Sequence, residues 1–154
     1  MATTYLNQNF PLQVVENTIP FPNGTYLLTS AQQTYQLIPN TTKSFQIKQT
    51  GSTLVLQAYV CGYSSNANGT NMTFRVNGVL YGTNGGSGDT WSRAHNGWSA
   101  SMNIGRIITI NHGLTAGSTC TVELMGGVWS SGSTYFGYPG YNTYMGWVAM
   151  EMGV

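Results

Sequence analysis

Charged side chains are scarce in this chain, and their scarcity excludes several classes of protein. Only 6% of the 154 residues are charged, five Lys or Arg and four Asp or Glu, against about 25% in an ordinary soluble domain. The formal net charge of +1 provides no basic patch for a phosphate backbone, so we expect no nucleic-acid partner. Because 41% of the residues are hydrophobic and 12% aromatic, the chain is too apolar to be disordered.

The chain also has little of what builds helices or crosses membranes. Ala, Leu, Glu and Lys, which favour helices, are sparse, and this disfavours a mostly helical fold. No apolar run approaches the roughly 18 residues that span a bilayer. The first residues show no basic segment followed by an apolar one, so we expect no signal peptide. The length suits a single domain with its own core.

Metal ligands are few and scattered. Cys61 and Cys120 are the only cysteines, and they lack the close spacing of a metal site. Without an export signal they are most simply small buried hydrophobes, and a disulfide is the alternative if their strands are neighbours. His95 and His112 stand alone in the sequence, and we expect His112 to satisfy a turn before Gly113. We therefore expect no metal and no cofactor.

The carboxylates do not form a catalytic pattern. No two of them are close enough in the sequence to indicate glycoside hydrolysis. The Gly-rich stretch 85–88 lacks the strand-to-helix context of a serine nucleophile elbow, so we expect no catalytic residues and no enzyme. We expect Glu151, near the chain end, either at a subunit interface or at the exposed end of a strand. The four carboxylates are Glu16, Asp89, Glu123 and Glu151.

Alternation of apolar and polar residues predicts β-structure along most of the chain. The run 53–63 places Leu54 and Leu56 on one face and Tyr59 on the other, which is typical of a central strand. Long loops rich in Gly and Ser are expected at 82–97 and 126–142. The other expected strands are 44–49, 71–76, 79–81, 106–111, 119–125 and 144–152.

The strongest local signal is Asn77-Gly78 between two apolar stretches. This dipeptide tolerates the positive φ that a type I′ turn requires at both central positions, so it predicts a hairpin. The N-terminal part is interrupted by prolines, with short strands expected at 14–15, 26–28 and 35–38. Residues 1–23 are expected to be an arm lying on a neighbouring subunit or, equally, an edge segment of the same domain.

Many short strands without a helical segment predict an all-β protein, an antiparallel β-sandwich or barrel. The succession of His112–Gly117, Cys120–Leu124 and Met145–Met150 resembles the closing half of the jelly rolls of tumour-necrosis-factor-like and complement-type trimers. Similar jelly rolls are common in bacteriophage virion proteins, which the hairpin Phe74–Val79 also resembles. The resemblance implies a jelly-roll domain over residues 24–154, assembly as a homotrimer and a place in a virion.

Two aromatic loops are candidate binding sites for a partner or a glycan. Trp and Arg dominate protein contacts, and aromatic faces also stack on sugar rings. The first loop could instead fold back onto the sandwich, and core packing explains about half of the second one. The candidates are Asp89, Trp91, Arg93, His95 and Trp98 in the first loop, and Trp129, Tyr135, Phe136, Tyr138 and Tyr141 in the second.

The low charge and abundant hydroxyl and amide groups suit a subunit that packs against others, because a net charge near zero promotes association. We therefore expect a non-enzymatic phage virion structural protein, a trimeric capsid decoration (cement) protein. Its partners would be itself and other virion proteins such as the major capsid protein. The alternative is a tail-fibre or receptor-binding tip that recognises host surface glycans. A hydrolase or lectin from outside phages is a third class.

Overall fold

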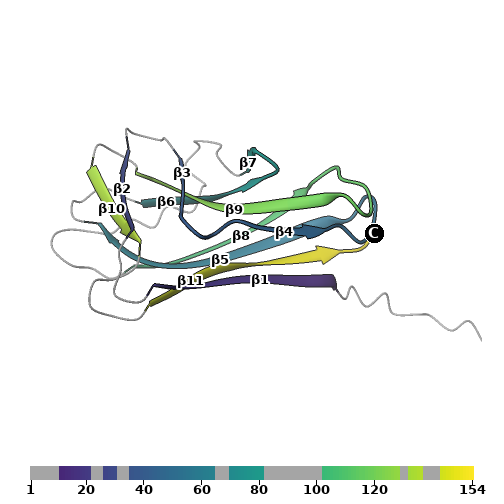
Figure 1. Ribbon diagram of the computed structural model, residues 1–154, viewed down its shortest axis with the longest axis horizontal. Coiled ribbons are helices and arrows are strands. Elements are labelled where there is room, and N and C mark those ends of the chain that lie inside the picture. Colours follow the sequence, from purple (N-terminus) through teal and green to yellow (C-terminus); the bar gives the residue numbers. More distant parts are fainter. Residues whose placement is uncertain are drawn as a thin grey trace, which may run out of the picture.

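The computed structural model describes residues 11–21, 26–30, 35–64, 70–81, 102–128, 132–136 and 143–154. These residues form two antiparallel sheets packed together, and none of them is helical (Figure 1). The predicted all-β sandwich is therefore confirmed. No helix in the described part of the chain is long and apolar enough to span a membrane.

A six-stranded sheet contains the first and last described strands. Its members are β1 (Pro11–Phe21), β2 (Tyr26–Ser30), β5 (Thr53–Ser64), β8 (Met102–Asn111), β10 (Gly132–Phe136) and β11 (Thr143–Met152). They pair in the order β1–β11–β5–β10–β2, and β8 pairs with β5 as well. Strand β5 is central, as its sequence predicts, and β1, β11 and β5 lie along the lower side of Figure 1.

The second sheet has five strands. They are β3 (Gln36–Leu37), β4 (Lys43–Gln46), β6 (Thr70–Val76), β7 (Val79–Tyr81) and β9 (Thr119–Val128). The order is β3–β9–β6–β7, and β4 pairs with β9 further along the same edge. Between β3 and β4 the Thr41 hydroxyl donates to the Ile38 carbonyl at 2.6 Å and accepts the Leu124 N–H at 3.2 Å. The Thr41 side chain therefore replaces the backbone hydrogen bonds that the edge of this sheet lacks between β3 and β4.

The strand pairings are nested about a single turn. Strand β1 pairs with β11, β2 with β10, β3 and β4 with β9, β5 with β8, and β6 with β7. The described strands thus form one long antiparallel hairpin, which is rolled up so that β11 also pairs with β5 and β9 with β6. Residues far apart in the sequence therefore become neighbours throughout the sandwich.

The tip of this hairpin is Asn77-Gly78, where the sequence predicts it. The φ angles of Asn77 and Gly78 are 46° and 82°, so both positions are positive, as a type I′ turn requires. The Asn77 side-chain oxygen also accepts the Thr121 backbone N–H at 2.7 Å, and the Asn77 N–H donates to the Thr121 carbonyl at 2.9 Å. These bonds attach the turn to β9.

The core lies between the sheets and follows the alternation of the strands. Leu54, Leu56 and Ala58 of β5 are buried, and the alternate residues of β6 and β9 face them. Trp147 is fully buried, and its indole N–H donates to the Thr41 carbonyl at 2.7 Å, which joins β11 to the opposite sheet. The inward residues of β6 and β9 are Met72, Phe74, Val76, Cys120, Val122 and Leu124.

One strand decides between two alternatives that the sequence left open, and another contradicts an expectation. Strand β1 pairs along its length with β11, so residues 11–21 are an edge segment of the same sheet, the second of the two alternatives. Pro11 and Pro20 are tolerated there because an edge strand has one side without partners. The expectation of one continuous loop over 126–142 is wrong for residues 126–128, which end β9, and for residues 132–136, which form β10 between β2 and β5.

Candidate functional site

Most of the predicted binding residues lie outside the described part of the chain. Tyr135 lies on β10, where its backbone pairs with Tyr63 and Leu27, and nothing further is described of it. Phe136 is fully buried, and a Cβ added at Gly126 would lie 2.6 Å from its ring. A surface contact by Phe136 is therefore wrong, because its ring fills the core. Outside the described residues are Asp89, Trp91, Arg93, His95, Trp98, Trp129, Tyr138 and Tyr141.

The described surface offers a different candidate, the side of the six-stranded sheet that faces away from the core. Its register aligns residues into rows across β1, β11, β5 and β8, and one row contains Val14, Met150, Val55 and Thr109. We call this surface the apolar outer face. It comprises Val14, Glu16, Thr18, Val55, Gln57, Tyr59, Ile107, Thr109, Gly146, Val148 and Met150.

Large apolar side chains on the apolar outer face are strongly exposed. Val14 is 58% exposed and Ile107 is 65% exposed, while Val55, Val148 and Met150 between them are partly buried. The strand alternation places them outward, because the core already takes the residues between them, such as Ala149 and Leu56. A row of exposed aliphatic side chains across a sheet indicates contact with another molecule.

Tyr59 extends across the face toward β1. Its hydroxyl lies 2.8 Å from the Thr18 hydroxyl, and a Cβ added at Gly146 would lie 2.9 Å from the same oxygen. Gly146 sits between them in the register, on β11. The absence of a side chain at Gly146 therefore lets the Tyr59 ring lie over β11 and cover the sheet with an aromatic surface.

Charge is almost missing from the apolar outer face. Among its residues only Glu16 carries a carboxylate, and the Thr18 hydroxyl donates to that carboxylate. No Lys or Arg belongs to the face; the Lys43 ammonium instead donates to the Glu16 backbone carbonyl at 2.6 Å. A partner that covers this face would therefore have few ions to dehydrate.

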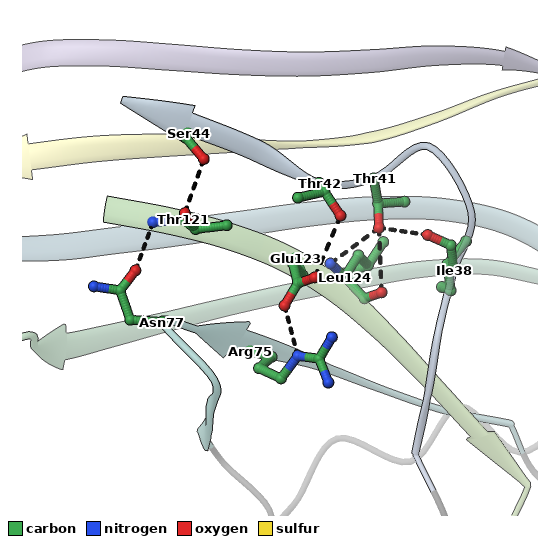
Figure 2. Close-up of polar contacts among 9 residues, drawn as sticks. All are labelled: Ile38, Thr41, Thr42, Ser44, Arg75, Asn77, Thr121, Glu123 and Leu124. Atoms are coloured by element: carbon green, nitrogen blue, oxygen red, sulfur yellow. Dashed lines mark hydrogen bonds and ion pairs between the residues drawn. The ribbon is translucent and has the colours of Figure 1, made fainter. Parts of the chain in front are cut away.

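Where β4, β9 and the end of β6 lie side by side, the outward side of the five-stranded sheet carries polar groups that bond to one another (Figure 2). The Arg75 guanidinium donates to the Glu123 carboxylate at 2.5 Å, and the Thr42 hydroxyl donates to the other oxygen at 3.3 Å. The hydrogen bond to Arg75 lowers the pKa of Glu123, and the same bond raises the pKa of Arg75. We call this surface the polar outer face: Thr42, Ser44, Arg75, Asn77, Thr121 and Glu123.

The remaining titratable groups have structural contacts. His112 accepts the Leu114 backbone N–H at 3.0 Å, so its expected role in the turn is confirmed. Cys120 is buried with a free thiol, which rules out its disulfide with Cys61, and burial raises its pKa to about 11. Glu151 is fully buried, so both expected positions for it are wrong. Within the described ranges no three His, Cys, Asp or Glu side chains are grouped so that they could hold a metal ion.

Comparison with known proteins finds no family model and no curated protein that matches this chain. Among solved structures it is similar to dimeric latent PorU from Porphyromonas gingivalis, with 12% sequence identity and a TM-score of 0.44. The match covers 93% of this chain and 13% of the PorU chain.

Proposed function

We propose that this chain is a non-enzymatic structural subunit of a bacteriophage virion, a capsid decoration protein that assembles as a homotrimer. The observation that carries the proposal is the apolar outer face, where exposed aliphatic residues such as Val14 and Ile107 surround partly buried ones with almost no charge. Such a face is typical of a surface that packs against another subunit.

The strand order supports the jelly-roll part of the proposal. In a jelly roll the strands form two Greek keys in two sheets. The proposal rests here on the nested pairing, with β1 on β11 and β5 on β8 in one sheet and β4 on β9 and β6 on β7 in the other. Strands β2 and β10 add a further nested pair beside β5.

The size of the apolar outer face sets how much it can contribute to self-association. Four strands about 4.8 Å apart, each rising about 3.3 Å per residue over the roughly five residues that belong to the face, present an area on the order of 300 Å². A stable interface buries roughly 800 Å² on each partner. The face therefore supplies the apolar centre of one subunit contact, and the surface around it supplies the rest.

Self-association is tested by the molecular mass in solution, measured by light scattering over a range of concentrations. We expect a trimer for the unchanged chain, and we expect Val14→Asp to weaken the assembly about a hundredfold or more, because an unpaired buried charge costs about 3–5 kcal/mol and the face has no Lys or Arg to pair with it. Val79→Asp is the matched control, since Val79 is 55% exposed but lies on β7 in the other sheet. A monomer at high concentration would overturn the assembly, and equal effects of the two variants would exclude this face.

The place in the virion is tested separately. A decoration protein binds to phage capsids that lack it and raises their melting temperature, and failure to bind would reject this role. The tail-fibre alternative predicts retention on host cells or on a glycan array. Trp91→Ala and Trp129→Ala would abolish that retention if the two aromatic loops bind the glycan.

A further inference from the structure

Glu151 is a buried carboxylate that no part of the proposed function uses. It lies near the end of β11, and its side chain has no exposure to solvent. Ser52 beside it is also buried, while the other two carboxylates among the described residues, Glu16 and Glu123, are more exposed. An ion without solvent contact requires hydrogen bonds from the protein, because burial without them costs several kcal/mol.

Four residues supply these hydrogen bonds, and each of them is a donor. The Ser52 hydroxyl donates to Oε1 at 2.7 Å, and the Gln49 backbone N–H donates to the same oxygen at 2.9 Å. The Lys48 backbone N–H lies 3.0 Å from both carboxylate oxygens. The Gln13 amide donates to Oε2 at 2.6 Å. The carboxylate is therefore surrounded by N–H and O–H groups that point toward it.

These donors come from two segments that are far apart in the sequence. Gln13 belongs to β1, the edge strand, and its amide also donates to the Gln46 carbonyl on β4 at 2.7 Å. Lys48, Gln49 and Ser52 belong to the turn that leads from β4 in one sheet to β5 in the other. Glu151 thus connects β11, β1 and the crossing between the two sheets at one end of the sandwich.

An ionised carboxylate accepts hydrogen bonds only, whereas a protonated one must donate one. The N–H groups of Lys48, Gln49 and Gln13 cannot accept, so a protonated Glu151 can donate only to the Ser52 hydroxyl, whose own hydrogen then turns to the Gln49 carbonyl at 2.7 Å. Protonation thus reverses one hydrogen bond and removes the charge that strengthens the other three. Burial raises the pKa of Glu151, but the hydrogen bonds from Lys48, Ser52, Gln49 and Gln13 outweigh it and leave the pKa below its ordinary value. The ionised form is therefore the one that the fold holds.

Two other titratable groups face Glu151. His112 lies beyond Ser52, with its Nε2 3.2 Å from the Ser52 hydroxyl; burial lowers its pKa, and the charge of Glu151 raises it in part. Cys120 on β9 feels the same charge, which adds to the effect of burial in raising its pKa. Lys48 contributes its backbone N–H, while the residue as a whole is exposed.

We propose that Glu151 is an acid-sensitive latch, which holds the start of β1 and the β4–β5 turn to the sandwich while ionised and releases them when protonated. A carboxylate with a depressed pKa contributes its full stabilisation above the unfolded value of about 4.3 and loses it as the pH falls through the folded value. His112 acts in the same direction at higher pH, since acid must charge a histidine that the fold keeps neutral. The latch does not depend on self-association.

Hydrogen exchange of the full chain, followed residue by residue from about pH 7 to about pH 3 and corrected for intrinsic rates, tests the latch. We expect the amides of Lys48, Gln49 and residues 12–15 to lose protection in acid before those of β6 and β9. Glu151→Gln at neutral pH should speed exchange at Lys48 and Gln49 about tenfold or more, because charge-assisted hydrogen bonds are lost. Simultaneous loss of protection in all strands would overturn the proposal.

Two further variants separate the latch from a general loss of stability. Glu123→Gln removes another strongly bonded carboxylate and should leave Lys48 and Gln49 protected; equal loss there would overturn the latch. Gln13→Met removes the donor on β1, together with its second bond to the Gln46 carbonyl, so residues 12–15 should open while the β4–β5 turn stays closed. Gln13→Met also carries the test if Glu151→Gln does not fold, and unchanged protection of residues 12–15 in it would contradict the proposal.

Discussion

The apolar outer face and the polar outer face lie on opposite sides of one sandwich and differ in what their side chains contact. On the polar outer face Arg75 and Glu123 bond to each other, and Asn77 bonds to β9. On the apolar outer face Val14 and Ile107 have more than half of their surface exposed, and Glu16 is the sole charge among its residues. The comparison teaches that low overall charge is not spread evenly: one face keeps its ions paired, and the other has almost none to pair.

The largest effect on the stability of the single chain is expected at Gly146, which lets Tyr59 cover the apolar outer face. Gly146→Val would place a side chain against the Asn17 carbonyl and the Tyr59 hydroxyl. We expect a loss of about 1–3 kcal/mol in the free energy of unfolding, the usual cost of overpacking. Urea denaturation followed by tryptophan fluorescence measures it. Thr109→Val, which changes an exposed position on the same face, should cost far less, and equal losses would contradict the close packing at Gly146.

A smaller effect is expected at the ion pair of the polar outer face. Arg75→Met removes the partner of Glu123, and because the Arg75 side chain is 33% exposed, the loss should be about 0.2–1 kcal/mol in the free energy of unfolding. The pKa of Glu123 is lowered in the folded chain, so the contribution of the pair is present at neutral pH and disappears as acid protonates Glu123. The free energies of unfolding of the unchanged chain and of Arg75→Met should differ at neutral pH and become equal in acid. A difference that stays constant with pH would contradict an origin in the ion pair.

The smallest effect is expected from salt on self-association. If the subunits meet through the apolar outer face, raising the salt concentration from about 0.05 M to about 0.5 M should change the association constant by less than about threefold, since there are almost no charges to screen. Sedimentation at the two salt concentrations measures this constant. A steep decrease of the association constant with salt would indicate that the subunits meet through the polar outer face instead.

Local pattern predicted much of the fold, and the candidate site only in part. The turn at Asn77-Gly78 was predictable because its positive φ angles depend on those two residues alone. Strand β10 was not, because Gly132–Phe136 has little apolar alternation and is a strand through its pairing with β2 and β5. The apolar outer face also escaped sequence reasoning, since alternation shows that Val14 and Ile107 leave the core without showing that they share a sheet.

The sequence by itself determined the β-class, the faces of strands such as β5 and β9, the hairpin tip and the shortage of charge, because each depends on neighbours within a few residues. The tertiary structure decided which strands meet, and with them the rows of the apolar outer face and the pairing of Arg75 with Glu123. It also decided the environment of Glu151, whose nearest donors in the sequence, on the β4–β5 turn, are 99 to 103 residues away. Contacts at such separations exist only after the long hairpin has rolled up, and no local pattern records them.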